Sequence, residues 1–530
     1  MSPIKIYVTY VLLLLGAFTS GVCAATDPLS NANRLPLSLE LKVQDFSNAL
    51  EASGYELMRG YWSLWSAEDC KYPLQTLGFC YGNNPTAPYV MAFVPHWKDE
   101  FVDQSMHHVL AAGQRNMTPN YRLGEREALV VLVELPPPAR YFGMQTNVFT
   151  GIDTLNTSDP VYQLLSSSPA LADLRRIIFS ASPNPDRMMF VASIGNSINN
   201  VLIEEQSKES WGQQRFFVIT PDQEMAEAMT DKLAALEGGD IRQVFTEPVS
   251  PSLAILGYGA EADDFITYIR YSMPNDIVLG EQWREQLPLT ILRVRDPNDT
   301  TANKPFEIPE YEPKEANFDE HALETDLSNL VAAVKEYWGD QSVVPVEFRS
   351  LSHWVDLIGQ HCLGSDGPPD PIEGITLPRG PMNCLGDSQD ADYQISGDVF
   401  YLDDDEVIAV VGTLGTETGN ATYTSISVNW FPELVGVLNR DDVVLQGSAV
   451  KFKDALAIPS TYKNFYVYYF ARDCSGLYPW CQEVSRTMVP RGDTVKIIQR
   501  NYINPGSMRG PDPSKVLNPF SITFYGRPKM

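Results

Sequence analysis

The stretch “YFGMQTNVF” (residues 141–149) has a counterpart far downstream in “YTSISVNWF” (residues 423–431). Aligned without gaps, the two stretches share a Tyr, an Asn and a Phe at the same positions. In both, alternate positions are apolar, which is typical of a β-strand with two different faces. The matched residues that we single out are Tyr141 with Tyr423 and Asn147 with Asn429.

The similarity extends upstream of both stretches. An apolar run precedes each of them, at residues 127–133 and 406–411, and a short loop follows the run. A buried strand, a turn and a second strand form a β-hairpin. Two interpretations stay open: the hairpins are copies of one diverged repeat, or they are unrelated and obey the same β-sheet rules.

The whole chain predicts an α+β fold, with two β-rich parts, a candidate diverged repeat, flanking a central α/β insert. Residues 25–149 begin with apolar residues at helical spacing and continue with strand-like runs. Residues 150–295 alternate strand and helix patterns, which favours an α/β unit. Residues 296–318 form a Pro-rich, charged linker, and residues 319–530 open with a helix and become strand-rich.

The central part contains two predicted helices. Residues 222–236 follow a strand and carry apolar residues on one helical face, with Thr220 or Asp222 as the N-cap. “SLAILGYG” (residues 252–259) is expected to be a strand, and “AEADDFITYIRYSM” (residues 260–273) a second helix.

Residues 1–24 have the features of a secretory signal peptide, with Lys5, an apolar stretch and small residues before Ala24. The apolar stretch is too short to span a bilayer comfortably, so an uncleaved anchor is the less favoured alternative. No later segment is apolar for long enough to cross a membrane. We therefore expect a secreted, extracellular protein without membrane contact after cleavage.

The cysteines indicate disulfides. Cleavage after Ala24 removes Cys23, one of seven cysteines, and the others stand as three close couples. In an oxidising compartment such couples favour local disulfides, and a cysteine metal site is disfavoured because no CxxC pair occurs. The expected bridges are Cys70–Cys80, Cys362–Cys384 and Cys474–Cys481.

Sequons predict N-glycosylation at Asn156, Asn298 and Asn420, whereas Pro119 weakens a fourth sequon at Asn116. The formal net charge of -28 disfavours nucleic acid and anionic membranes as partners, because both require a basic surface. A small molecule or a glycan remains as the expected partner, and nothing indicates an oligomeric state.

Several common catalytic motifs are absent from the sequence, among them GxSxG, HExxH and GxxxxGK[ST]. Gly386-Asp387-Ser388 is similar to the start of some esterases, but those enzymes need a later histidine, and the last histidine here is His361. The aspartates around Ser388 offer oxygen ligands for calcium, with a solvated acidic turn as the favoured alternative. We predict no cofactor and no metal site.

The candidate site residues fall into two sets. His107 and His108 are the one adjacent histidine pair, and either could act as a general base if a carboxylate orients it. The polar faces of the two matched strands form the candidate substrate-binding surface. Its residues are Arg140, Tyr141, Gln145, Asn147, Tyr423 and Asn429.

Length and secretion favour an extracellular hydrolase of unknown substrate. The missing nucleophile motifs favour the alternatives, a noncatalytic glycan- or ligand-binding protein or a structural surface protein. “NNPTAPY” (residues 83–89) and “RYFGMQ” (residues 140–145) resemble two strand segments of an uncharacterised bacterial secreted family. The first segment lacks the aspartate of that family, and the resemblance implies no activity.

Overall fold

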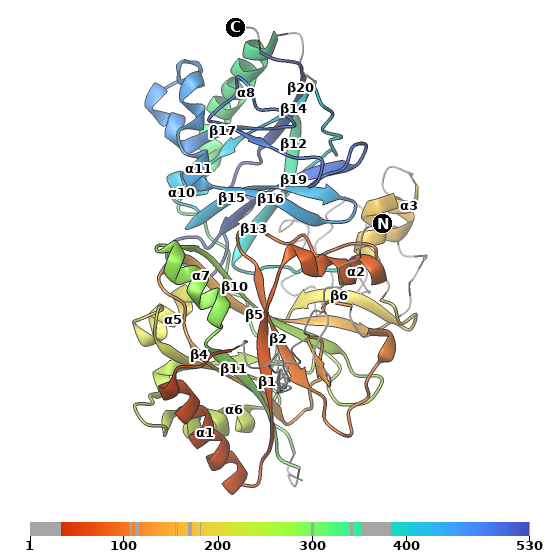
Figure 1. Cartoon of the computed structure of the whole chain (residues 1–530), viewed down its shortest axis with the longest axis vertical. Helices are drawn as coiled ribbons and strands as arrows, with labels where there is room; N and C mark the ends of the chain where they lie inside the picture. Colours follow the sequence, from red (N-terminus) through yellow and green to blue (C-terminus); the bar gives the residue numbers. More distant parts are fainter. Residues whose placement is uncertain are drawn as a thin grey trace, which may run out of the picture.

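The computed structural model describes residues 33–106, 109–111, 116–153, 155, 157–158, 160–167, 172–180, 182–297, 302–339, 343–350 and 383–528. Within these ranges the chain forms two curled β-sheets, which Figure 1 shows as two lobes stacked along the long axis. Residues 33–295, here called the N-terminal half, build the lower lobe. Residues 319–528, the C-terminal half, build the upper lobe.

The N-terminal half contains an eleven-stranded sheet in the part of the chain described. Its strands are β1 (Glu56–Trp65), β2 (Tyr89–Pro95), β3 (Met117–Thr118), β4 (Glu127–Glu134), β5 (Ala139–Ile152), β6 (Arg187–Ser193), β7 (Ile198–Asn199), β8 (Gln214–Thr220), β9 (Val244–Pro248), β10 (Asp264–Pro274) and β11 (Leu289–Arg295). Its α-helices are α1 (Leu37–Ala52), α2 (Lys71–Thr76), α3 (Pro160–Ser166), α4 (Ala172–Ile178), α5 (Asn200–Ser207), α6 (Gln223–Ala234) and α7 (Ile277–Gln286).

The C-terminal half contains a nine-stranded sheet among its described residues. Its strands are β12 (Val346–Ser350), β13 (Ala391–Ser396), β14 (Glu406–Thr413), β15 (Tyr423–Phe431), β16 (Val435–Asp441), β17 (Phe465–Ala471), β18 (Cys481–Glu483), β19 (Thr494–Tyr502) and β20 (Phe520–Tyr525). Its α-helices are α8 (Glu324–Trp338), α10 (Gly415–Thr418) and α11 (Asp442–Leu445).

The two sheets have the same strand order. The lower sheet runs β6-β5-β10-β2-β1-β11-β4-β8-β9, and the upper sheet runs β16-β15-β19-β13-β12-β20-β14-β17-β18. Strands that hold the same place in the two sheets also follow one another in the same order along the chain, and only the short β3 and β7 lie off this path. Neighbours are antiparallel in both sheets, except for the parallel pairs β8–β9 and β17–β18 at the ends.

The central strand of each sheet changes its partner halfway along. The first part of β1 pairs with β11 and its second part with β2, while β12 pairs first with β20 and then with β13. Such a change of partner lets a sheet fold over on itself. Gly60 lies where β1 makes the change, and a Cβ atom there would lie 2.3 Å from Phe93 O. The close approach of the two backbones therefore requires glycine at this position.

The central part differs from the prediction. Its strands β6, β8, β9, β10 and β11 complete the lower sheet together with β1, β2, β4 and β5, so residues 150–295 do not form a separate α/β insert. The segment predicted as the second helix contains β10, and residues 252–259 are turns and irregular backbone. Both faces of β10 are buried, so its sequence lacks the alternation of a strand with one wet face.

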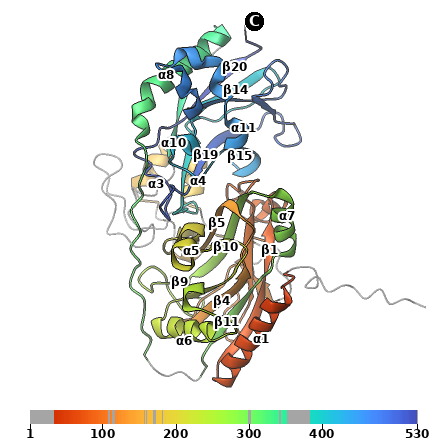
Figure 2. The same ribbon diagram turned by 90° about the vertical axis from the view of Figure 1, so that its left-hand side faces the viewer.

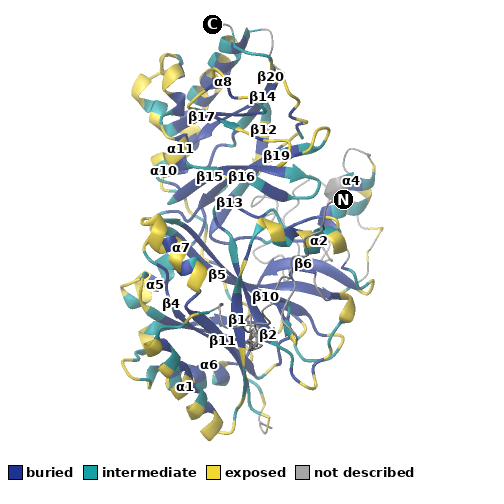
Figure 3. Cartoon of the chain, viewed as in Figure 1, coloured by how far each residue is buried: buried dark blue, intermediate teal, exposed yellow. Residues whose placement is uncertain are grey.

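Helices cover the outer faces of the sheets (Figure 2). Helix α1 buries Leu39, Val43, Phe46 and Leu50 in a core that it shares with β4, β8 and α6. The predicted helix at 222–236 is confirmed as α6, with Asp222 as its N-cap: Asp222 Oδ1 accepts a hydrogen bond from Met225 N at 2.8 Å. Figure 3 shows that the sheets are buried, while the exposed residues gather on the helices and loops.

The segment between the halves runs along one side of both lobes (Figure 2). Phe306 N donates to Pro221 O in the lower lobe, and Tyr311 bonds to Ser193 through the two hydroxyl groups at 2.8 Å. Asn317 Nδ2 donates to Gly419 O in the upper lobe. The predicted linker is thus fixed to both halves.

Candidate functional site

A cavity of about 1050 Å³ lies at the junction of the two halves. The lower sheet lines it with residues of β1, β2, β6 and β10, and the upper sheet with residues of β12, β13, β15 and β19. Most of the lining is aromatic or aliphatic, and polar groups come mainly from the upper sheet. The residues used below are Trp65, Tyr89, Met91, Ile266, Tyr268, Ser388, Tyr393, Ile395, Lys496, Ile498 and Arg500.

Strand register explains why these side chains face one space. In the lower sheet Arg270 on β10 lies opposite both Tyr89 on β2 and Gly143 on β5. Directly opposed residues point to the same face of a sheet, and so do residues two positions apart. In the upper sheet Arg500 on β19 lies opposite Tyr393 on β13 and Ser425 on β15, at the corresponding place.

Arg270 belongs to a buried ion pair across the junction. Its Nη2 donates to Asp390 Oδ1 at 2.8 Å, and both side chains are almost fully buried. Its Nη1 donates to Ser388 Oγ at 2.9 Å and to Tyr393 OH at 3.1 Å. Tyr141 OH donates to the second oxygen of Asp390 at 2.9 Å. One aspartate of the upper half therefore satisfies two residues of the lower half.

Arg500 has a different set of partners. Its Nη1 donates to Ser427 Oγ, and its Nη2 donates to Gly82 O at 2.8 Å. The guanidinium lies over the ring of Tyr393, 5.3 Å from the centroid. The side chain is 2 % exposed, and no carboxylate of the described residues lies within 4.0 Å of its nitrogens.

Tyrosines surround these arginines and remain protonated. Burial raises the pKa of Tyr89 to about 12, and it raises the pKa of Tyr268 above the usual range. The rings of Tyr89 and Tyr268 lie 5.3 Å apart. The cavity lining thus offers the phenol hydroxyls of Tyr89 and Tyr268 as hydrogen-bond donors, in addition to the buried guanidinium of Arg500.

The two matched tyrosines of the sequence converge at the junction. Tyr141 packs against Tyr502 at 4.7 Å between ring centroids, and Tyr423 stacks on the same ring at 5.2 Å. Tyr423 OH shares a hydrogen bond with Thr86 Oγ1 at 2.9 Å, as Tyr141 does with Asp390. Both tyrosines are fully buried, and neither belongs to the described lining of the cavity. They connect the halves next to the cavity.

The other predicted binding residues also lie outside the described lining of the cavity. Gln145 accepts a hydrogen bond from Ser197, and the side-chain amide of Asn147 has no hydrogen-bond partner among the described residues. Asn429 donates to Ser427, and Arg140 forms an ion pair with Asp442 of the other half. Their role in substrate binding stays a prediction.

Several predicted residues lie outside the described ranges, namely His107, His108, Asn156, Asn298 and Cys362. Asn420 is described, and its position contradicts glycosylation. Its Nδ2 donates to Phe318 O at 2.9 Å and to Glu320 at 3.0 Å, and the side chain is fully buried. A glycan on this nitrogen would replace one of the two donated hydrogens and has no space beside the fully buried side chain.

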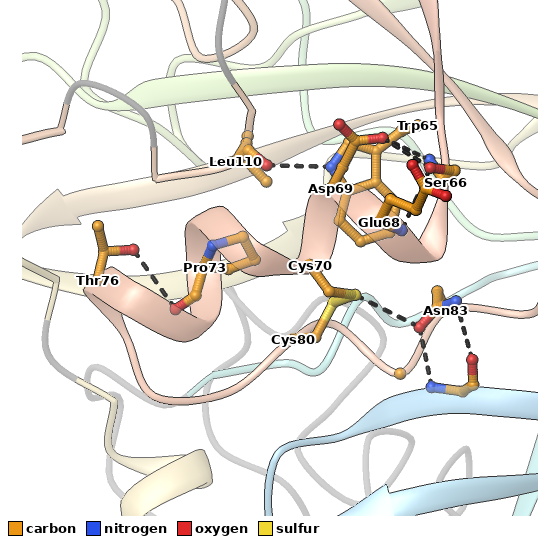
Figure 4. Close-up of a disulfide and its surroundings, with 12 residues drawn as sticks. Trp65, Ser66, Glu68, Asp69, Cys70, Pro73, Thr76, Cys80, Asn83 and Leu110 are labelled. Atoms are coloured by element: carbon orange, nitrogen blue, oxygen red, sulfur yellow. Dashed lines mark hydrogen bonds between the residues drawn. A yellow bond between two sulfur atoms is a disulfide. The ribbon is translucent and has the colours of Figure 1, made fainter. Parts of the chain in front are cut away.

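Two predicted disulfides are confirmed, Cys70–Cys80 and Cys474–Cys481. Cys384 is also disulfide-bonded. The first bridge, which Figure 4 shows, lies beside the cavity, because Cys80 is part of the lining. Asn83, close to this bridge, accepts a hydrogen bond from Gly436 N of the upper half at 2.9 Å. The disulfide loop therefore borders the junction.

The cavity lining includes His321, whose Nδ1 lies 2.9 Å from Asp319 Oδ1, and the exposed carboxylates of Glu324, Glu347 and Asp398. Ser388 Oγ bonds to Arg270, Tyr393 and Gly386 O, and none of these is a general base. Burial lowers the pKa of Lys496 to about 8, and its Nζ donates to Ser396 O at 2.8 Å. The described residues hold no group of three or more His, Cys, Asp or Glu side chains placed to bind a metal ion. No helix within the described ranges is both long and apolar enough to cross a bilayer.

Sequence reasoning missed the two arginines that organise this site. Arg270 lies in the segment predicted as a helix, and Arg500 lies in the part predicted to be strand-rich, without a motif around it. The signal that could have found them is the match between residues 141–149 and 423–431. Extending the match of residues 141–149 and 423–431 to the next paired strands aligns Arg270 with Arg500 and Tyr89 with Tyr393.

Known proteins give little guidance. No family model matches the chain, and no curated protein matches it. The chain is similar to a solved structure of an uncharacterized protein from Burkholderia cenocepacia. The two are 9% identical, the match covers 92% of this chain and 94% of the other, and the TM-score is 0.34. A similarity of this size carries no information about function.

Proposed function

We propose that the protein is an extracellular binding protein that holds a small apolar molecule in the junction cavity. The cavity lining supports this most. Aromatic and aliphatic side chains from both halves line a volume of ligand size, together with polar and charged groups such as Ser388, Lys496 and Arg500. Such a combination is typical of sites that bind small molecules.

The geometry gives less support to the hydrolase that length and secretion favour. A hydrolase of the serine type needs a base within hydrogen-bond reach of the hydroxyl. The partners of Ser388 are instead an arginine, a tyrosine and a carbonyl oxygen. A guanidinium donates to this hydroxyl and cannot accept its proton.

We infer further that the two halves are copies of one ancestral unit, as the matched hairpins suggest. Their common strand order and their central strands with switched partners support this. A local turn is repeated as well: Glu127 accepts from Gly124 N at 2.9 Å, and Glu406 accepts from Asp403 N at 2.9 Å. A ligand site at the junction then belongs to the pair of copies rather than to either one.

The experiment combines identification of a bound molecule with a cavity-filling variant. Protein purified from the culture medium is extracted with organic solvent, and the extract is examined by mass spectrometry. Ile498→Trp fills the cavity, because Ile498 is buried in the lining, and Ile458→Trp is a matched control at an exposed position. We expect a small apolar molecule in extracts of wild type and control, and its loss from Ile498→Trp.

Two outcomes would contradict the proposal. The first is an extract without any small apolar molecule, together with no thermal stabilisation by a panel of apolar compounds. The second is turnover of an ester, glycoside or peptide substrate that disappears in Ser388→Ala, which would favour the hydrolase.

A further inference from the structure

The matched arginines differ in one respect, which is their counter-ion. Arg270 and Arg500 occupy corresponding places in the two sheets and are both buried. The charge of Arg270 is balanced by Asp390, whereas no described carboxylate balances that of Arg500. A buried charge without a partner is unfavourable unless something else compensates it.

Comparing the two halves shows which residue of the lower half corresponds to Asp390, the counter-ion of Arg270. Asp390 precedes Tyr393 by the same interval that separates Thr86 from Tyr89. Asp390 and Thr86 each bond to the matched tyrosine of the other half. Asp390 accepts a hydrogen bond from Tyr141, and Thr86 shares one with Tyr423. The carboxylate of the upper half thus corresponds to a neutral hydroxyl in the lower half.

Arg500 also differs from Arg270 in its access to the cavity. Arg500 is part of the described lining, and Arg270 is not. Lys496 lies on the same face of β19 and lines the same space. Tyr89, Tyr268 and Tyr393 line this space as well, and the Arg500 guanidinium lies over the ring of Tyr393. A carboxylate is a preferred partner for a guanidinium, and phenols can donate further hydrogen bonds to it.

From these observations we infer that the ligand is an amphipathic organic acid, whose carboxylate pairs with Arg500 and whose apolar body lies along Met91, Ile266 and Trp65. This inference rests on the proposed function, since it requires that the cavity binds a small molecule. The carboxylates of Glu324, Glu347 and Asp398 also line the cavity, but all three are exposed. Water and salt screen their charges more than that of the buried Arg500.

The test compares acids with their neutral amides. Delipidated full-length protein is titrated with decanoate and 2-naphthoate, and with decanamide and 2-naphthamide, by calorimetry. We expect each acid to bind at least about 30-fold more tightly than its amide, because a buried charge pair with hydrogen bonds contributes on this scale. Arg500→Gln should reduce the affinity for the acids to that for the amides and leave the affinity for the amides unchanged.

Arg500→Lys keeps the charge and should retain part of the preference, which guards against a folding defect of the glutamine variant. Arg349→Gln removes an exposed arginine of the same cavity and should leave the preference intact. Equal binding of acid and amide to wild type would overturn the anion inference while the proposed function stands. A preference that survives Arg500→Gln would overturn the assignment to Arg500. Failure of all four compounds to bind would overturn the proposed function, and the inference with it.

Discussion

Asp390→Asn should lower the free energy of unfolding by about 3–5 kcal/mol, because it leaves the buried Arg270 without a counter-ion. Asparagine preserves the size of the side chain, so no cavity contributes to this loss. The ion pair is 2.8 Å long, and its two side chains are 1% and 0% exposed, so water cannot replace the lost carboxylate. The effect should therefore lie far above that of a surface ion pair.

Urea unfolding followed by far-UV circular dichroism measures this loss. A double-mutant cycle with Arg270→Gln should give a coupling energy of about 2 kcal/mol or more, since the second substitution removes the unpaired charge. Asp404→Asn is the matched control: it breaks the exposed pair with Arg486 and should leave the unfolding free energy nearly unchanged. A loss of less than about 1 kcal/mol for Asp390→Asn, or strictly additive effects in the cycle, would refute the reasoning.

Three further predictions concern stability. Burial raises the pKa of Glu247 to about 7, so the folded state holds a proton that the unfolded state loses near pH 4. The free energy of unfolding should therefore fall as the pH rises from about 4 to 7. Urea titrations at several pH values should show a flatter pH profile for Glu247→Gln than for the wild type. The double variant Cys70→Ala/Cys80→Ala should lower the unfolding free energy by about 3 kcal/mol through loss of the loop constraint, and a melting temperature equal to that of the wild type would contradict this. Gly60→Val should prevent close pairing of β1 with β2 and lower the yield of folded protein, measured by secretion level; a normal level would show that the two backbones can separate there.

Local patterns predicted much of the fold. The apolar run at 127–133 became β4, and the cap at Asp222 began α6, because these features depend on neighbours in sequence. The match of residues 141–149 with 423–431 identified β5 and β15, which hold the same place in the two sheets. It did so because both stretches alternate apolar with other residues, which is the local pattern of a strand.

The failures arose where tertiary burial hides the pattern. Both faces of strand β10 are buried, and polar residues such as Arg270 and Thr267 are interspersed with its apolar and aromatic ones, so its sequence shows no clear strand alternation and also fits a helix. Its true neighbours, β5 and β2, lie more than a hundred residues away in sequence, and no local rule specifies that pairing. The polar face of β5 was predicted to bind substrate, and its Tyr141 is buried against Tyr502 from the other half. Only the packing of one half on the other decides which polar residues remain accessible.

The unequal neighbours of Arg270 and Arg500 have a consequence for how such a site can evolve. In a dimer of identical chains, a substitution changes both equivalent places at once, so an acidic residue that neutralises one arginine would neutralise its twin. A single chain that contains two lobes with the same strand order is free of this constraint. One arginine can then acquire Asp390 and hold the lobes together, while the other, beside Thr86, keeps its charge for a partner from outside.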